Sequence, residues 1–287
     1  MGQYDEFFDE EYLKQVDKLE EWELEKINRL NKLGMVYATK TTKAGDQMEL
    51  DIYPTFWVRH DGARKKKTKA SREAQKNLND RRSRRHLADM INTNFGKGDL
   101  WCTFTYDDNH LPENADRAKR MFGNFVKRVN RWRAKKGLGN LKYIVVTEWD
   151  DDPEAKVRVH HHAVIKNDMG DEGMGILNRK WGYGGRNNIR EAQPDENGLT
   201  GMALYMAKGR KNKSEKHFSS SRNLKKPTVT KALGKFSRRR VEKMTFDPDY
   251  RKEIIEKKYP GYRYLDAEPM VNKVNGGFYL YVRMTRT

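Results

Sequence analysis

The sequence has little cysteine and no long apolar run. Cys102 is the single cysteine among 287 residues, so the chain cannot form an internal disulfide, which fits a reducing compartment. No segment approaches the roughly 18 consecutive apolar residues that a membrane-spanning helix requires, and the first residues lack the basic-then-apolar pattern of a signal peptide. These absences predict a cytoplasmic protein that does not insert into membranes.

The sequence also lacks a phosphate-binding loop and an excess of acids. No G-x-x-x-x-G-K-[ST] motif occurs, so we expect no fused helicase. There are 59 Lys and Arg residues against 41 Asp and Glu residues, a formal net charge of +18, although the first thirty residues are acidic. Such a surplus attracts polyphosphates and makes binding salt-dependent. Nucleic acid is the expected partner, while ribosomal and membrane-peripheral proteins can carry similar surfaces.

Hydrophobic periodicity divides the chain into expected helices and strands. An amphipathic helix is expected over residues 4–33, and Pro54 is expected to end the second of two short strands. A densely basic segment covers residues 64–85. Helices are expected at 71–92, 115–135, 199–210, 229–244 and 248–258, with a short one after 170; strands are expected at 35–41, 48–53, 100–106, 143–149, 157–165, 188–192, 262–265 and 278–284.

Three consecutive histidines lie in one of these strands, between β-branched or small apolar residues. Alternate side chains of a strand face the same side, so His160 and His162 share one face and His161 points to the other. Glu148 precedes His160 by 12 positions, and a hairpin that turns near residues 150–153 can set its carboxylate opposite the histidines. Two imidazoles and a carboxylate can bind one divalent ion, although buried, hydrogen-bonded histidines would give the same pattern.

The helix expected at 199–210 decides the chemistry. Tyr205 flanks its buried stripe, and Lys208 follows at i+3. The order strand, helix, strand, strand, helix, strand, helix predicts an α+β fold, namely a ferredoxin-like antiparallel sheet with the histidine hairpin at its centre and helices on one side. We expect an N-terminal accessory region at 1–94, a catalytic core at 95–227 and a basic C-terminal extension at 228–287.

These motifs, in this order, resemble the HUH endonucleases, and specifically the rolling-circle replication initiators of plasmids, phages and mobile elements. The resemblance covers roughly residues 98–227. It rests on the segments His160-His161-His162, Glu148-Trp149, Cys102-Thr103-Phe104-Thr105-Tyr106, Tyr205-Met206-Ala207-Lys208 and Ser221-Arg222-Asn223-Leu224-Lys225-Lys226-Pro227. No single motif is specific, but their order and spacing together are hard to obtain by chance.

The resemblance implies a metal-dependent nickase that joins a DNA strand to Tyr205. His160, His162 and Glu148 would hold Mn²⁺ or Mg²⁺, and Lys208 would favour the phenolate or the developing phosphate charge. The products would be a 5′-phosphotyrosine and a free 3′-hydroxyl. Two-tyrosine initiators carry the second tyrosine four residues later, where this chain has Gly209, so a single-tyrosine enzyme is expected.

The expected substrate is single-stranded or hairpin DNA at a replication origin. A host helicase would unwind the duplex, and a second protomer is one way to close the strand, so a dimer is among the expected states. The helix at 115–135 is expected to carry a basic outer face that includes Arg128 and Arg133. DNA contacts are expected at Arg117, Lys127, Arg131, Arg81, Arg82, Arg85, Arg222 and Lys225.

Alternatives stay open at this point. A relaxase or a single-tyrosine transposase would use the same residues. A DNA-binding regulator without cleavage would keep the salt-sensitive binding and would function without Tyr205. A 2-His-1-carboxylate iron oxygenase has the same ligand types, but it predicts a jelly-roll strand pattern and leaves the charge of +18 unexplained.

Overall fold

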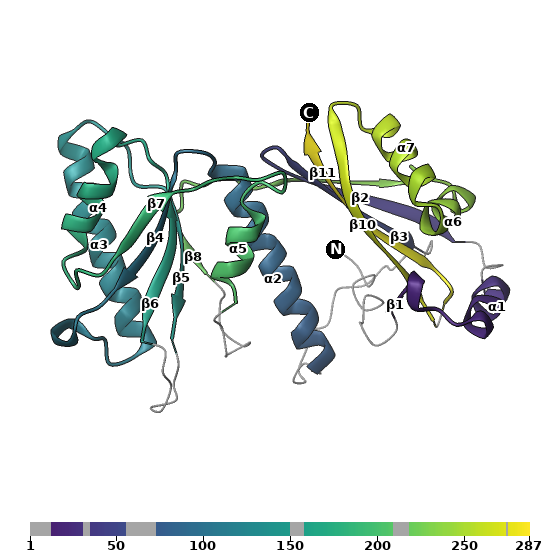
Figure 1. Ribbon diagram of the computed structural model, residues 1–287, viewed down its shortest axis with the longest axis horizontal. Coiled ribbons are helices and arrows are strands. Elements are labelled where there is room, and N and C mark those ends of the chain that lie inside the picture. The colour runs from purple at the N-terminus through teal and green to yellow at the C-terminus, as the bar shows by residue number, and fades with distance from the viewer. Residues whose placement is uncertain (1–12, 31–34, 56–72, 150–157, 209–217, 274) are drawn as a thin grey trace, which may run out of the picture. The chain divides into compact units, whose positions relative to one another are not determined.

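The computed structural model describes residues 13–30, 35–55, 73–149, 158–208, 218–273 and 275–287. These residues form a mixed α+β structure with seven α-helices and two antiparallel sheets (Figure 1). The chain divides into two compact units. The terminal unit comprises Met1–Arg81 and Pro227–Thr287, and the central unit is Arg82–Lys226. None of the helices among the described residues is long and apolar enough to cross a membrane.

The terminal unit is built on a six-stranded sheet with the order β1-β10-β11-β3-β2-β9. Its strands are β1 (Leu13–Gln15), β2 (Val36–Ala44), β3 (Gln47–Thr55), β9 (Thr228–Leu233), β10 (Tyr262–Asn272) and β11 (Phe278–Arg286), and its helices include α1 (Glu21–Leu30), α6 (Arg238–Phe246) and α7 (Pro248–Lys258). Residues 1–94 and 228–287 were expected to form two separate regions. In the structure, β11 pairs with β3 and β9 pairs with β2. Segments from both ends of the chain therefore share one sheet.

Three sequence-based expectations for this unit are wrong. The single helix at 4–33 is interrupted, because β1 pairs with β10 and α1 begins only at Glu21, where the Glu23 carboxylate accepts the backbone N–H of Glu20 at 3.0 Å. Residues 228–233 form strand β9, and α6 begins later, after Ser237 caps it. The run of Thr and Val residues in β9 explains that preference. Pro54 lies inside β3, which continues to Thr55.

The central unit carries a five-stranded antiparallel sheet with the order β7-β4-β6-β5-β8. Its strands are β4 (Leu100–Thr105), β5 (Tyr143–Glu148), β6 (His160–Ile165), β7 (Asn188–Glu191) and β8 (Ser219–Ser220). The crossover from β4 to β5 runs through α3 (Ala115–Lys135), and that from β6 to β7 runs through α4 (Gly173–Trp181). The histidine strand β6 lies between β4 and β5, which confirms that the hairpin is central.

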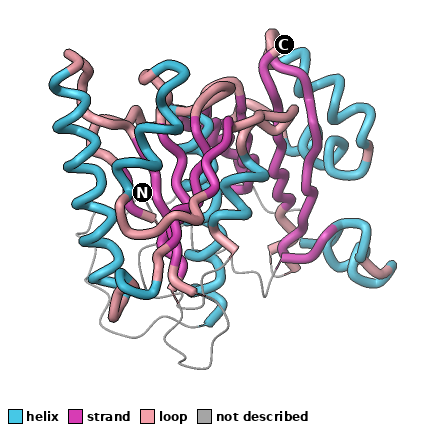
Figure 2. The backbone as a smooth tube through the Cα atoms, turned by 60° about the vertical axis from the view of Figure 1, so that its left-hand side comes forward, coloured by secondary structure: helices cyan, strands magenta, loops and turns pink. Residues whose placement is uncertain are grey.

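Helices cover both faces of this sheet, so the expected arrangement with helices on one side is wrong (Figure 2). On one face, Cys102, Phe104 and Ala163 pack with α3 and α4. On the other face, Ile144, Val146 and Val164 pack with α2 (Glu73–Asn94) and α5 (Thr200–Met206). Both faces are apolar at these positions, and each therefore needs a helix to cover it.

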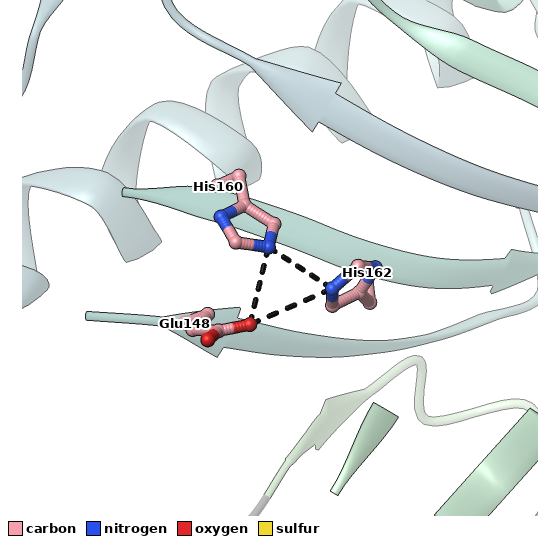
Figure 3. Close-up of side chains that lie close together, drawn as sticks. All are labelled: Glu148, His160 and His162. Carbon is pink, nitrogen blue, oxygen red and sulfur yellow. Dashed lines mark hydrogen bonds and ion pairs between the residues drawn. The ribbon is translucent and has the colours of Figure 1, made fainter. Parts of the chain in front are cut away.

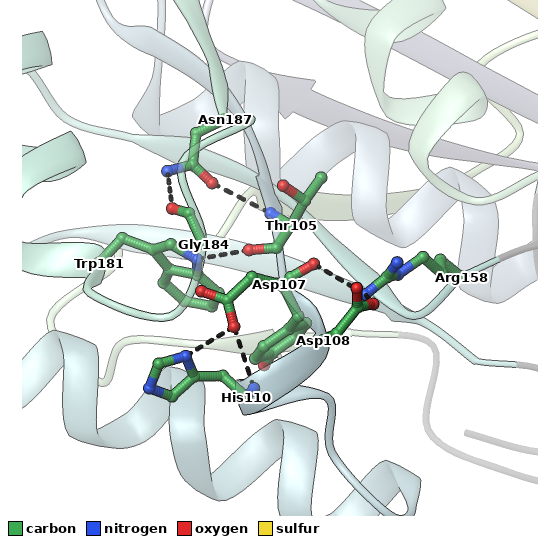
Figure 4. Close-up of polar contacts among 9 residues, drawn as sticks. Thr105, Asp107, Asp108, His110, Arg158, Trp181, Gly184 and Asn187 are labelled. Atoms are coloured by element: carbon green, nitrogen blue, oxygen red, sulfur yellow. Dashed lines mark hydrogen bonds and ion pairs between the residues drawn. The ribbon is translucent and has the colours of Figure 1, made fainter.

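A polar network fastens the end of β4 to the loop between α4 and β7 (Figure 4). The indole N–H of Trp181 donates to the Thr105 carbonyl at 2.7 Å, and the Thr105 N–H donates to the side chain of Asn187 at 3.1 Å. Arg158, which precedes the histidine strand by two residues, pairs with Asp108 at 2.7 Å. The strand end next to the histidines is thus held by side chains as well as by the sheet.

The outer face expected for α3 needs one correction. Arg133 is buried, and its guanidinium forms a bidentate pair with Asp168, with N–O distances of 2.5 and 2.8 Å. Arg128 is half-buried and donates to the carbonyls of Lys180 and Trp181 and to the Tyr183 hydroxyl. These two arginines serve the packing of α3 against neighbouring segments.

Candidate active site

The β5–β6 hairpin brings a carboxylate and two imidazoles together (Figure 3). The antiparallel register places Glu148 opposite His160, and His162 follows on the same face. His160 Nε2 lies 3.1 Å from Glu148 Oε2, His162 Nε2 lies 3.6 Å from it, and the two Nε2 atoms are 3.0 Å apart. The expected side-by-side placement of the three residues is confirmed.

These three atoms fit a single metal ion. Nitrogen and carboxylate ligands bind a divalent ion at about 2.0–2.2 Å, so donor atoms about 3.0–3.6 Å apart can reach one ion together. His160 Nδ1 lies 2.8 Å from the Arg158 carbonyl, which requires a proton on Nδ1 and directs Nε2 into the cluster. His162 Nδ1 is 3.2 Å from the Thr103 hydroxyl, which fixes that ring similarly. The group can hold a metal ion, and its ligand types are compatible with both Mn²⁺ and Mg²⁺.

Within the cluster, the interaction between Glu148 and the histidines lowers the pKa of Glu148 and raises that of His160. Hydrogen bonding to His160, and then to His162, holds the pKa of Glu148 far below its usual range. Burial lowers the pKa of His160, but the bond to Glu148 and the bond to the Arg158 carbonyl outweigh it, so the net pKa is raised. The cluster therefore keeps a carboxylate anion next to basic nitrogens, which is the donor set that a divalent cation attracts.

His161 belongs to the core on the other face. It is fully buried, and its Nε2 and Nδ1 lie 2.6 Å from the Tyr106 hydroxyl and 3.0 Å from the Thr147 hydroxyl. Burial, together with the nearby His160 and His162, lowers the pKa of His161 to about 3. The middle histidine is consequently neutral and structural, as the strand alternation predicts.

Tyr205 lies on the face of the sheet that carries Glu148, His160 and His162. It is on α5, whose buried side chains include Met202, Ala203 and Met206, and it is 56% exposed. Its ring contacts the His162 ring edge-on, with 5.5 Å between centroids, and it contacts the Trp101 ring at 5.7 Å. The structure thus brings the expected nucleophile to the edge of the His–His–Glu cluster.

Lys208 lies in the turn that ends α5, where its backbone N–H donates to the Tyr205 carbonyl at 3.1 Å. Its side chain is exposed. Helix α5 ends at Met206, four residues before the expected end at residue 210. Gly209, the position that would hold a second tyrosine, lies outside the described residues.

The expected DNA-contact residues are distributed over both faces of the central sheet. Arg117, Lys127 and Arg131 are exposed on α3, which packs on the face opposite to the His–His–Glu cluster. Arg81, Arg82 and Arg85 belong to α2, which packs on the same face as the ligands. Arg222 and Lys225 are exposed in the segment after β8, and the basic run at 64–72 lies outside the described residues. Only the α2 group therefore lies on a helix that shares the face of the cluster.

Sequence reasoning missed two contributors to this face. Thr103 orients His162, and Arg190 lies next to Trp101 on the edge strand β7. Strand alternation did place Trp101 and Thr103 on one face. The pairing of β4 with β6 and β7 could not be obtained from the pattern, and that pairing sets Thr103 between His162 and Asn188.

Comparison with known families singles out the same part of the chain. Residues 99–210 match the family model described as replication-associated protein ORF2/G2P. The matched segment contains Glu148, His160, His162, Tyr205 and Lys208. Searches of curated proteins and of solved structures found no match. The fold also lacks the jelly roll that an iron oxygenase would require, since the described residues form a mixed α+β structure.

Proposed function

We propose that the protein initiates rolling-circle replication by nicking and rejoining single-stranded DNA, a proposal supported by the match of residues 99–210 to the replication-associated protein ORF2/G2P family model. The observation that carries the proposal is the contact between the Tyr205 ring and the His162 ring, next to the Glu148–His160–His162 cluster. A phenol beside a metal-ligand set is the arrangement needed for attack on a phosphodiester.

The residues divide the work as follows. Glu148, His160 and His162 would hold Mn²⁺ or Mg²⁺, and a bound ion would supply Lewis-acid withdrawal of charge from the scissile phosphate. The Tyr205 phenol loses its proton to solvent as its oxygen attacks phosphorus. The bond from phosphorus to the 3′-oxygen breaks, and that oxygen takes up a proton. The products are a 5′-phosphotyrosine and a free 3′-hydroxyl.

Lys208 assists by charge. From the turn after Tyr205, a lysine ammonium can favour the phenolate or the negative charge that develops on the phosphate.

Attack of a 3′-hydroxyl on the phosphotyrosine reverses the first step and rejoins the strand. With one tyrosine on α5, the second cleavage of a replication cycle requires another group, and a second protomer in a dimer would supply an equivalent Tyr205.

The fold supports this assignment at the level of architecture. The strand order β7-β4-β6-β5, with crossovers through α3 and α4, favours a ferredoxin-like core within the proposed nuclease region at 95–227. Single-stranded or hairpin DNA at an origin is the proposed substrate, and a host helicase is the proposed partner. A relaxase or a single-tyrosine transposase would use the same chemistry on a different element.

The decisive experiment is the capture of the covalent adduct. The purified chain is incubated with Mn²⁺ and a pool of random-sequence single-stranded DNA, and adducts that resist denaturation are recovered. Trypsin cleavage after Arg190 and Lys208 releases residues 191–208, in which Tyr205 is the only tyrosine. We expect the DNA on this peptide, and we expect no adduct with Tyr205→Phe or after chelation of the metal.

Matched control variants test the assignment of Tyr205 as nucleophile separately from the assignment of the protein as a DNA-nicking enzyme. Tyr183→Phe should keep full adduct yield, because Tyr183 packs against Arg128 and Trp181 on the other face of the sheet. His162→Ala should lose Mn²⁺ binding in calorimetric titration together with the adduct. Salt-sensitive DNA binding without any adduct would instead identify a DNA-binding regulator.

A further inference from the structure

A small cavity adjoins Tyr205 on the side of Trp101. It has a volume of about 230 Å³ and is lined by Trp101, Thr103, Asn188, Arg190 and Tyr205. This is below the roughly 300–1,000 Å³ of pockets that enclose a drug-sized ligand, so it suits one small group. Of these residues, Tyr205 is the proposed nucleophile and Thr103 orients His162, while the proposed adduct chemistry gives Trp101, Asn188 and Arg190 no role.

The sheet register connects this cavity to the metal ligands. Thr103 pairs with His162 on one side and with Asn188 on the other, so the three residues form a row across β6, β4 and β7. Trp101 and Arg190 pair in the next row on the same face. From strand spacings, the Cα atoms of His162 and Arg190 are about 12 Å apart. The cavity is therefore beside the reaction centre and outside the first ring of metal ligands.

The Arg190 side chain packs against an aromatic ring. Its guanidinium carbon lies 4.1 Å from the centre of the Trp101 ring, which is a cation–π contact. Within the described part of the chain, the guanidinium contact found for Arg190 is this one with Trp101 and no carboxylate pairs with it; the residue is exposed. Stacking uses the flat face of the guanidinium and leaves its N–H groups free to form a two-pronged bond to an anion.

Trp101 couples this arginine to the nucleophile. Its ring contacts the Tyr205 ring edge-on at 73° and the Arg190 guanidinium on its face. The indole thus fixes the distance between the phenol that would attack one phosphate and the cation that would bind another. A DNA strand that places its scissile phosphate at Tyr205 must pass close to this cavity.

We propose that Arg190, supported by Trp101, binds a backbone phosphate next to the scissile one, and that Asn188 and Thr103 line the same subsite. This rests on the proposed function, because attack by Tyr205 defines the scissile position. The subsite would recognise the phosphodiester rather than a base. The Arg190 guanidinium has no carboxylate partner among the described residues, and guanidinium groups bind phosphate in a fixed geometry. The cavity is also small. Arg190 would fix the register of the DNA strand as a positioning residue, without touching the reacting atoms.

The test uses Arg190→Gln, with Arg186→Gln as the matched control in the loop before β7. Arg186 is exposed and does not line the cavity. Single-turnover adduct formation is measured with the oligonucleotide recovered from the adduct experiment. We expect half-saturation at about 10-fold to 100-fold more DNA for Arg190→Gln, since a charge-assisted bond is lost. The slope of log affinity against log salt should fall by about 0.7, the value for one phosphate on a single strand.

Uncharged methylphosphonates, placed singly along the oligonucleotide, locate the phosphate. With the unaltered protein, one position next to the cleavage site should weaken binding. With Arg190→Gln, the same substitution should have no further effect, while Arg186→Gln should respond like the unaltered protein. Equal saturation curves for all three proteins would overturn the subsite and leave the proposed function standing. Absence of any adduct with the unaltered protein would instead overturn the proposed function.

Discussion

The imidazoles of His160, His161 and His162 have three different surroundings, although the residues are adjacent. His160 bonds a backbone carbonyl, His162 a threonine hydroxyl and His161 a buried tyrosine hydroxyl. The first two keep Nε2 for the face with Glu148, and the third fills the core on the other face. The role of each ring thus depends on which hydroxyl or carbonyl forms a hydrogen bond with one of its two nitrogens.

Asp168 gives a prediction at the scale of one residue. Its carboxylate is the bidentate partner of the buried Arg133, and this pairing holds the pKa of Asp168 below its usual range. Asp168→Asn should lower the free energy of unfolding at pH 7 by about 1–2 kcal/mol, a modest value because Asp168 is 46% exposed. Urea denaturation measures it. Asp171→Asn, at an exposed site, should change it by less than about 0.5 kcal/mol.

The same pair predicts a pH dependence. A carboxyl whose folded pKa is depressed stabilises the protein fully above its unfolded pKa of about 3.9, and this contribution is lost as pH falls through the folded value. The stability difference between the unaltered protein and Asp168→Asn should therefore be constant from pH 7 to 5 and shrink below pH 4. A difference that grew on acidification would contradict this account.

Individual residues also show where sequence reasoning reached its limit. Alternation along one strand was enough to separate His161 from its neighbours, and the expected hairpin was enough to place Glu148 opposite them. Arg133 was expected on an exposed basic face, because helical spacing does not reveal that Asp168, 35 residues later, lies against it. Contacts set by the crossing of distant elements, such as Thr103 with His162, have no local signature.

Among the elements, the loop between α4 and β7 approaches the end of β4 very closely. A Cβ on Gly184 would lie 2.6 Å from the Thr105 carbonyl oxygen and 2.9 Å from the Asp107 nitrogen. Both atoms belong to the backbone and cannot turn away. Gly184→Ala should therefore cost about 1–3 kcal/mol of unfolding free energy, as overpacking does.

Gly185 supplies the control for this prediction, because a Cβ there meets nothing within 4 Å. Gly185→Ala should change stability by less than about 0.5 kcal/mol. Thermal or urea unfolding of the two variants makes the comparison. Equal effects at both positions would show that loop flexibility, and not the contact with β4, governs the cost.

The accuracy of the element predictions followed the strength of the local pattern. Helices α3 and α7 have the bounds expected, because an apolar stripe marks the first and a Pro after the Asp247 cap begins the second. Residues 13–15 and 229–233 were expected to be helical and lie in strands β1 and β9. Both lie at sheet margins, where pairing with β10 or β2 overrides a weak helical period.

At the scale of the whole molecule, each hydrophobic core found among the described residues is made of residues from one unit. The terminal unit has a core around Leu50, Phe278 and Val282, and the central unit has one on each face of its sheet. Calorimetry should thus resolve two unfolding transitions. Mn²⁺ at 100 times its dissociation constant should stabilise only the central unit, by about 2.7 kcal/mol, because Glu148, His160 and His162 all belong to it.

His162→Ala provides the check, since it should abolish the shift with Mn²⁺ and leave the other transition at its original temperature. If Mn²⁺ moved both transitions equally in the unaltered protein, the two units would unfold as one cooperative body. In that case the metal could not be assigned to the stability of one unit.

Strand β11 occupies an interior position, between β10 and β3, although its sequence comes after that of the whole central unit. On the ribosome, residues 82–226 emerge and can fold before Phe278–Arg286 has been made, while β3 must wait for its neighbour. A nonsense codon at position 278 would spare every proposed catalytic side chain and still leave two unpaired strand edges, β3 and β10. Such a product should aggregate although the sequence of its central unit is complete.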